Sequence, residues 1–291
     1  MDNYLQQNKD LWNELTPIHE RSAFYDVAGF KAGKCTLLSI EREEMGDVSG
    51  KSLLHLQCHF AMDTLCWGRR GAKVTGVDFS EESIKTAQKL SRETGIKARF
   101  ICSDVYALPD VLKGKFDIVF TSYGVLCWLP DLKKWAEIIA HFLKPGGFFY
   151  IVGCHPFMNA FENSRTTTEL KITQSYFHNP EPIKWEPEGD YADSNAKVDH
   201  PSFEWAHSLG DILNSLIRAG LKIEFLYEFP LCCYKAIPFM MQDKDGWWRL
   251  EGDKIGYARA PAIAGSARTS ACRLSPVIRT IPGTAAGSEP A

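Results

Sequence analysis

The chain has 291 residues, of which 45% are hydrophobic and 24% charged, and a formal net charge of −3. This balance is typical of a folded globular protein and excludes a disordered chain, a coiled coil and a fibre. The charge gives no basic footprint for nucleic acid, and no apolar run reaches the roughly 20 residues of a membrane span. The first residues carry no secretory signal, so we expect a cytoplasmic protein that binds neither nucleic acid nor membrane.

Nine cysteines are spread over the sequence. In a cytoplasmic protein they should be reduced thiols, because disulfides persist mainly in oxidising compartments. They form no paired C-x-x-C sets, which are the usual spacing of structural zinc ligands. The sequence therefore predicts neither a disulfide framework nor a metal site.

The first 50 residues are expected to form an N-terminal helical segment whose aromatic side chains, such as Trp12 and Tyr25, close one side of a site. From residue 51, short apolar runs alternate with amphipathic stretches. We expect strands at 52–58, 73–78, 98–102, 116–120, 148–152 and 221–226, and helices at 62–70, 81–94, 132–143 and 209–219. Apolar strands separated by helices indicate a doubly wound α/β fold, Rossmann-like, with a mostly parallel sheet. Its core is predicted at 51–155 and 209–255.

Residues 156–208 interrupt the alternation and are rich in aromatic residues and prolines. An insertion at this edge of the sheet is well placed to be a lid over a substrate pocket. The alternative is that its aromatic side chains form a satellite core beneath a long loop.

The composition changes after Ile255, and 21 of the last 36 residues are Ala, Gly, Pro or Ser. Such a segment buries little apolar surface, so we expect a flexible tail over 256–291, either a low-complexity extension or a non-native end. We also expect the sheet to lack its final strand, or to take a poor substitute from 276–281.

Acidic residues close two of the predicted strands. Asp78 is the last residue of the second strand and is placed to accept the hydroxyls of a ribose, and Asp104 follows the third strand and is placed to accept an adenine amino group. The alternative is that each caps the turn that follows it.

The segments 74–80 (VTGVDFS), 102–105 (CSDV), 116–119 (FDIV) and 143–147 (LKPGG) together resemble the class I S-adenosylmethionine-dependent methyltransferases. The wider chain looks like a bacterial branch of that family with an unknown substrate. The resemblance implies S-adenosylmethionine as the cofactor, held by Asp78, Phe79, Asp104, Val105 and Ser122.

The first loop departs from the family pattern, because His55, Gln57, His59 and Ala61 replace an acid and three glycines. Glycines let a backbone approach a pyrophosphate closely, so their loss disfavours a nicotinamide or flavin enzyme. S-adenosylmethionine has no phosphate, and we expect Gln57 and Asp63 to bind its amino acid end, with His59 beside it. The alternative is that these side chains pack and cap the loop.

Two residues on the substrate side are candidates for catalysis. Tyr123 follows the fourth strand and could position an acceptor or pack at the sheet edge, and His155 follows the fifth and is the candidate general base, although a lone histidine is often structural. The sequence predicts methyl transfer to a small molecule by a monomer or homodimer. The alternative is a non-catalytic S-adenosylmethionine or nucleoside-binding protein.

Overall fold

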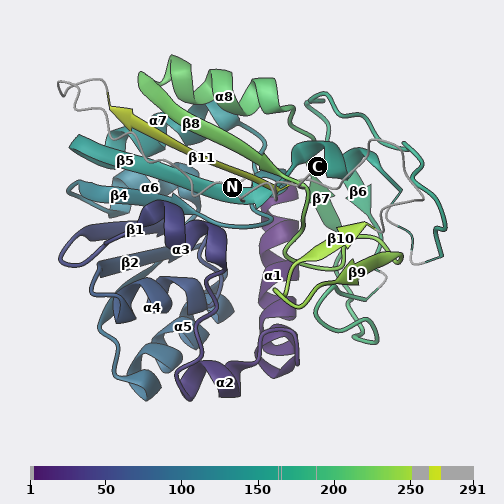
Figure 1. Cartoon of the computed structure of the whole chain (residues 1–291), viewed down its shortest axis with the longest axis horizontal. Coiled ribbons are helices and arrows are strands. Elements are labelled where there is room, and N and C mark those ends of the chain that lie inside the picture. The colour runs from purple at the N-terminus through teal and green to yellow at the C-terminus, as the bar shows by residue number, and fades with distance from the viewer. Residues whose placement is uncertain (1–2, 163, 165, 188, 251–261, 270–291) are drawn as a thin grey trace, which may run out of the picture.

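A seven-stranded sheet forms the centre of the protein, with strand order β3-β2-β1-β4-β5-β11-β8 (Figure 1). The computed structural model describes residues 3–162, 164, 166–187, 189–250 and 262–269. Strands β1 to β5 pair in parallel, and β11 is antiparallel to both of its neighbours. This confirms the predicted mostly parallel α/β fold. The strands are β1 (Ser52–Leu56), β2 (Lys73–Asp78), β3 (Ala98–Cys102), β4 (Phe116–Thr121), β5 (Leu143–Cys154), β8 (Leu221–Phe229) and β11 (Ala262–Thr269).

Helices cover both faces of the sheet. Phe149 and Ile151 of β5 pack with α7 and α8 in one apolar cluster, whereas Tyr150 and Val152 pack with α3 and α4 in a second. Successive residues of a strand point to opposite faces, so the two clusters are the two sides of the core. The helices are α1 (Asn3–Arg21), α2 (Val27–Lys31), α3 (Ser39–Met45), α4 (Met62–Arg69), α5 (Glu81–Thr94), α6 (Leu108–Val111), α7 (Leu132–Phe142) and α8 (Leu209–Arg218).

Local sequence signals set the ends of these elements. Ser80 caps α5 by accepting the Ser83 N–H, and Gly95 ends the helix in the left-handed conformation. These are the usual start and stop signals of a helix. Gly147 allows a close approach in β5, because a Cβ there would lie 2.9 Å from the backbone oxygen of Asp117.

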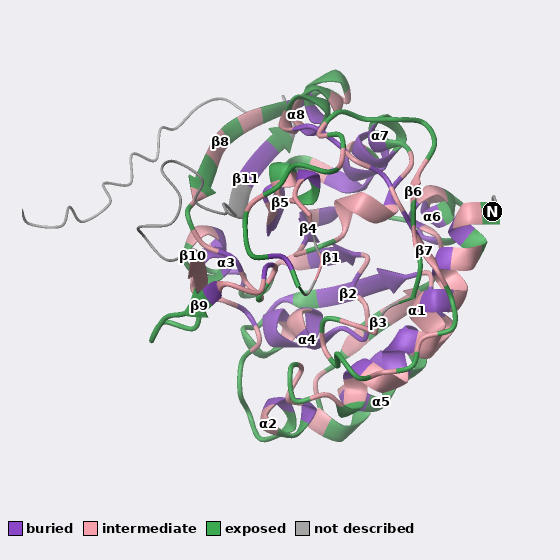
Figure 2. Cartoon of the chain, turned by 90° about the vertical axis from the view of Figure 1, so that its right-hand side faces the viewer, coloured by how far each residue is buried: buried purple, intermediate pink, exposed green. Residues whose placement is uncertain are grey.

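The insertion at 156–208 packs beside α1 (Figure 2). Its described elements are short: η3 (Pro156–Ala160), β6 (Ile183–Trp185) and β7 (Ser202–Glu204). The Asn8 side chain of α1 binds both backbone groups of Phe203, donating to its oxygen at 2.7 Å and accepting its N–H at 2.8 Å. A second small sheet, β9 (Met240–Gln242) with β10 (Trp248–Leu250), follows β8. None of the helices described is both long and apolar enough to span a bilayer.

The predicted absence of a final strand is wrong. β11 lies inside the segment expected to be flexible, and it inserts between β5 and β8, where Ala267 is paired with Phe149 on one side and Ile223 on the other. A strand between two others gains backbone hydrogen bonds along both edges, and these do not require apolar alternation. Composition alone could not show that two open edges were available. The other candidate, 276–281, lies outside the described residues.

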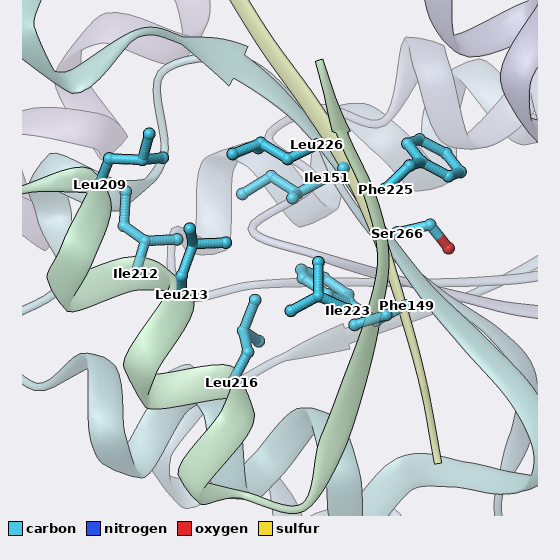
Figure 3. A pocket seen from close by; sticks show the side chains of 12 residues that line it. Phe149, Ile151, Leu209, Ile212, Leu213, Leu216, Ile223, Phe225, Leu226 and Ser266 are labelled. Atoms are coloured by element: carbon cyan, nitrogen blue, oxygen red, sulfur yellow. The ribbon is translucent and has the colours of Figure 1, made fainter. Parts of the chain in front are cut away.

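The small residues of β11 leave an apolar cavity of about 20 Å³ beneath α8 (Figure 3). Leu209, Ile212, Leu213 and Leu216 of α8 point toward the sheet across this cavity. Gly265, Ser266 and Ala267 line it from β11. A cavity of this kind lowers stability, because the atoms that line it lose contacts on one side.

Filling the cavity from β11 should therefore stabilise the protein. Ala267 is 1% exposed and belongs to the same core cluster as Ile212 and Leu216. We expect Ala267→Val to raise the free energy of unfolding by about 1 kcal/mol, measured by urea denaturation. Arg268→Val places the same side chain at the exposed neighbouring position and should change stability by less than about 0.5 kcal/mol. A loss of stability in Ala267→Val would show that the cavity cannot accept two methyl groups.

Candidate cofactor and acceptor site

The loop after β1 has the backbone shape of a glycine loop without glycines. Gln57, His59 and Ala61 have φ values of 56°, 50° and 67°. Non-glycine residues pay about 1–2 kcal/mol each for this left-handed conformation. The alternating left-handed residues turn the chain sharply between β1 and α4, so the loop retains the geometry although its sequence departs from the pattern.

Asp78 fixes this loop from the end of β2. Its carboxylate accepts the backbone N–H of His59 at 2.8 Å and that of Ser80 at 3.0 Å, one on each oxygen. Burial raises the pKa of Asp78 to about 6, against the effect of these hydrogen bonds. A carboxylate has about four acceptor sites, so Asp78 can still accept ribose hydroxyls while it holds the loop.

Gln57 has a buried polar atom that the protein does not satisfy. Its side-chain nitrogen donates to the Val125 oxygen at 3.1 Å, but its Oε1 atom is buried and has no partner. Buried acceptors nearly always have a donor, so an orphan atom at this position fits the donor group of a ligand. The ammonium of an amino acid end meets this requirement.

The His59 side chain points toward α1 and α5. Its Nε2 atom lies 2.9 Å from Nδ1 of His19, and its Nδ1 atom lies 3.0 Å from Oγ of Ser83. Nε2 of His19 in turn lies 2.8 Å from Oδ1 of Asp190 in the insertion. Burial, with His19 nearby, holds the pKa of His59 well below its usual range, so His59 is neutral. The predicted position of His59 beside a methionine group stays a prediction.

Three consecutive residues of α1 hold three different parts of this site. The Trp12 ring lies 5.1 Å from that of His59, between ring centres. The Asn13 side chain accepts the Ser80 hydroxyl at 2.8 Å, and Glu14 accepts the ring nitrogen of His200 at 2.6 Å. The N-terminal helix therefore contacts the first loop, the start of α5 and the insertion at once.

The residues predicted to hold adenine follow the ends of β2 and β3. Asp104 accepts the Tyr106 N–H at 3.0 Å and caps η1 (Val105–Ala107), so one carboxylate oxygen serves the turn as the alternative interpretation expected. Val105 is buried and Phe79 is half-buried. A partly open aromatic ring and a buried apolar side chain are suited to the faces of a planar base.

A chain of polar side chains crosses the site between β1 and β4. His55 contacts Thr64 at 2.8 Å and Ser122 at 3.2 Å, and burial lowers the pKa of His55 to about 3. Ser122 donates to Asp63, which also accepts the Thr36 hydroxyl at 2.5 Å. Burial raises the pKa of Asp63. The neutral His55 thus replaces the acid expected at its position, and Asp63 supplies the carboxyl group in this chain of side chains.

Tyr123 is oriented by a glutamate that the sequence did not point to. Its hydroxyl donates to Glu41 at 2.9 Å, and Glu41 also accepts the Leu38 N–H in the cap of α3. Glu41 is 1% exposed, and burial together with nearby Asp63 raises its pKa to about 7. Nothing in the local pattern around residue 41 distinguishes a buried acid from an exposed one on a helix, so only the fold reveals it.

His155 lies toward the β8 side of the sheet. Its Nδ1 atom accepts the Phe157 N–H at 3.2 Å, which caps η3, and its Nε2 atom lies 2.7 Å from Oε1 of Glu228. Both ring nitrogens are engaged. For His155, this arrangement fits the alternative interpretation, a structural histidine, better than a general base.

Part of the chain is similar to a known family of protein domains. Residues 54–151 match the family described as a methyltransferase domain. Curated relatives named ubiquinone biosynthesis O-methyltransferase include that of Idiomarina loihiensis, 36% identical over 98 residues, and that of Chromobacterium violaceum, 32% identical over 103 residues. The matched region covers 34% and 35% of this chain but only 40% and 44% of those relatives.

Solved structures agree on the fold. A methyltransferase from Clostridium acetobutylicum superposes with a TM-score of 0.52 at 17% identity, covering 89% of this chain and 98% of that one. One from Mesorhizobium loti gives 0.53 at 21% identity, covering 82% and 99%. Residues 54–151 therefore match a methyltransferase domain, a family whose methyl donor is S-adenosylmethionine. The solved methyltransferases share the fold of this chain.

Glu41 should titrate near neutral pH in the folded protein. Carbon-detected NMR of labelled glutamate should show one carboxyl with a pKa of about 7, absent in Glu41→Gln. Tyr123→Phe should raise that pKa further, because the Tyr123 hydrogen bond favours the ionised form. The folded pKa lies above the unfolded value of 4.5, so this contribution to stability is full below about pH 4.5 and declines as pH rises through 7. A Glu41 signal that titrates at the ordinary value would contradict the burial.

Proposed function

We propose that the protein transfers a methyl group from S-adenosylmethionine to a small-molecule acceptor. The observation that carries this proposal is the left-handed backbone at Gln57, His59 and Ala61. A loop that had decayed would relax into ordinary conformations, because each strained residue lowers stability. Strain kept at three positions beside Asp78 instead supports a loop maintained for a ligand.

We assign the cofactor to residues of this loop and to those that follow the ends of β2 and β3. Asp78 accepts the ribose hydroxyls, Asp104 and Val105 face the base with Phe79, and Gln57 Oε1 accepts the ammonium. When bound, S-adenosylmethionine supplies an electrophilic methyl group on sulfur. Asp63 and Ser122, linked to His55, form the polar wall at the amino acid end.

The acceptor is assigned to the side of Tyr123. Methyl transfer needs alignment of the nucleophile first, and a base only where the acceptor must lose a proton. Glu41 has a pKa of about 7, so above neutral pH it can take such a proton, directly or through the Tyr123 hydroxyl that it holds. His155 is less suited, because its ring nitrogens are already bonded to Phe157 and Glu228.

Closure by aromatic side chains supports a small acceptor rather than a macromolecule. The hydroxyl of Tyr25 in the N-terminal segment hydrogen-bonds that of Tyr191 in the insertion. The Tyr191 ring in turn lies 6.2 Å from that of Tyr234, which follows β8. Three segments distant in sequence thus meet over the carboxyl ends of the strands, and they must part for a substrate to enter.

Two experiments test the proposal. Calorimetry measures the binding of S-adenosylmethionine, S-adenosylhomocysteine and NAD. An activity assay then detects the release of S-adenosylhomocysteine with a panel of small hydroxyl, amine and thiol compounds as acceptors. We expect binding of the first two ligands and no binding of NAD. Binding without turnover on any acceptor would favour the second candidate, a non-catalytic binding protein. The buried Glu41–Tyr123 pair is the observation that favours the enzyme over it.

Asp78→Asn should weaken S-adenosylmethionine binding about 30-fold, or about 2 kcal/mol, because the ribose loses a charged acceptor. Isothermal titration calorimetry measures the dissociation constant. Asp117→Asn is the matched control: Asp117 binds Ser52 and Lys144 at the start of β4, far from the loop in the sheet, and should not change affinity. Equal affinity of Asp78→Asn and the wild type would remove Asp78 from the ribose site.

His59→Gly should weaken cofactor binding by about threefold to tenfold. Glycine relieves the left-handed strain, but the variant loses the contacts to His19 and Ser83, each worth about 1 kcal/mol, and the loop becomes more flexible. Ala61→Gly is the control within the same loop, because it relieves strain without removing a polar contact. Its affinity should stay within about twofold. Tighter binding in His59→Gly would show that the imidazole obstructs the cofactor.

A further inference from the structure

Three cysteine thiols converge at the carboxyl edge of the sheet. Cys154 is the last residue of β5, and Cys232 and Cys233 are neighbours in the segment that follows β8. Their sulfur atoms all lie within 4.8 Å of one another. No metal-ligand spacing is visible in the sequence, because the fold brings the three residues together through β5 and β8, on either side of β11.

The thiols sit in a fixed and apolar environment. Cys232 is 2% exposed and packs with Ile237 and Met240, and Met158 and Trp248 pack against the same cluster. Its backbone is held by two hydrogen bonds with Trp248, at 2.8 and 2.9 Å. The three sulfur atoms are therefore positioned by a folded framework and not by an open loop.

The spacing of the three sulfur atoms allows them to bind one ion. Three thiolates that each lie about 2.3 Å from one ion are about 4 Å apart from each other, and the three sulfur atoms here all lie within 4.8 Å of one another, which is compatible with that arrangement. Thiols are weak hydrogen-bond donors and acceptors, so they gain little from one another in an apolar cluster. All three are free thiols in the structure.

From these observations we infer that Cys154, Cys232 and Cys233 bind one thiophilic d10 metal ion through three sulfur ligands. Soft thiolate ligands select Cu(I) and Zn(II) among the common ions. Binding is a ligand exchange without oxidation or reduction: each thiol that coordinates gives its proton to water, and the ion loses water ligands. The ion would join the end of β5 to the chain after β8, independently of the proposed methyl transfer.

The two ions make different demands on this site. Structural Zn(II) takes four ligands, so with three thiolates it needs a water or an exogenous ligand in the fourth position. Cu(I) is satisfied by sulfur alone, and the thioethers of Met158 and Met240 belong to the same cluster. The test therefore has one arm for each ion.

The experiment titrates the reduced full-length protein, without oxygen, with Zn(II) or with Cu(I) buffered by a competing chelator. The thiolate-to-metal absorption band and native mass spectrometry are the readouts. We expect one ion per chain, a mass gain that is reduced by the displaced protons, and a rise in thermal midpoint, because the ion binds only the folded state. Cys154→Ser and Cys233→Ser should each weaken binding by more than about 100-fold. Cys102→Ser removes an exposed thiol of β3 and should bind as the wild type does.

Three outcomes would overturn the inference. The first is that neither ion gives a band or a mass shift on the wild-type chain, a result that does not depend on any variant folding. The second is that the affinity is equal in Cys154→Ser, Cys102→Ser and the wild type. The third is a mass two hydrogens lower with no metal bound after reduction and gel filtration, which would make the cluster a disulfide pair.

Discussion

The hydrogen bond from the His59 backbone N–H to the Asp78 carboxylate is the contact on which the rest of the site depends. It joins the left-handed loop after β1 to the end of β2, which pairs with β1 in parallel. Gln57, His59 and Ala61 are all strained, and together their conformations oppose folding by a few kcal/mol. The buried Asp78 carboxylate opposes this strain, because its loss would leave the backbone N–H groups that it accepts without a partner. The strained loop conformation is therefore held in place by its hydrogen bond to Asp78.

The two segments that lie over the site, α1 and the insertion at 156–208, are hydrogen-bonded to the same loop. His59 is hydrogen-bonded to His19 of α1, and His19 is hydrogen-bonded to Asp190 of the insertion. Both segments are thus connected to His59, one of the strained residues. If His59 is neutral and donates from Nε2, then His19 accepts at Nδ1 and donates to Asp190, and each ring has one consistent tautomer. A change in the loop when a ligand binds would therefore alter the contacts of α1 and of the insertion. Such a link can couple ligand binding in the loop to the access of a second substrate.

The sequence predicted the layered α/β fold, its mostly parallel sheet and the acids at two strand ends, since these follow from periodicity and from the position of Asp78 and Asp104. It did not predict Glu41, the Cys154–Cys232–Cys233 cluster or the strand at 262–269. The first two are long-range juxtapositions, which no local pattern encodes. The strand was missed because composition measures what side chains can bury, whereas β11 is held mainly by backbone bonds to β5 and β8.

The strand β11 also determines which residues meet at the edge of the sheet where β5 and β8 end. β11 separates β5 from β8, and Ala262 is in register with both Cys154 and Phe229. The pair of His155 with Glu228 and the three thiols both reach across it. The small residues Gly265, Ser266 and Ala267 of β11 line the cavity beneath Leu213 of α8. The backbone pairing of β11 thus sets how β5 and β8 lie relative to each other at this edge.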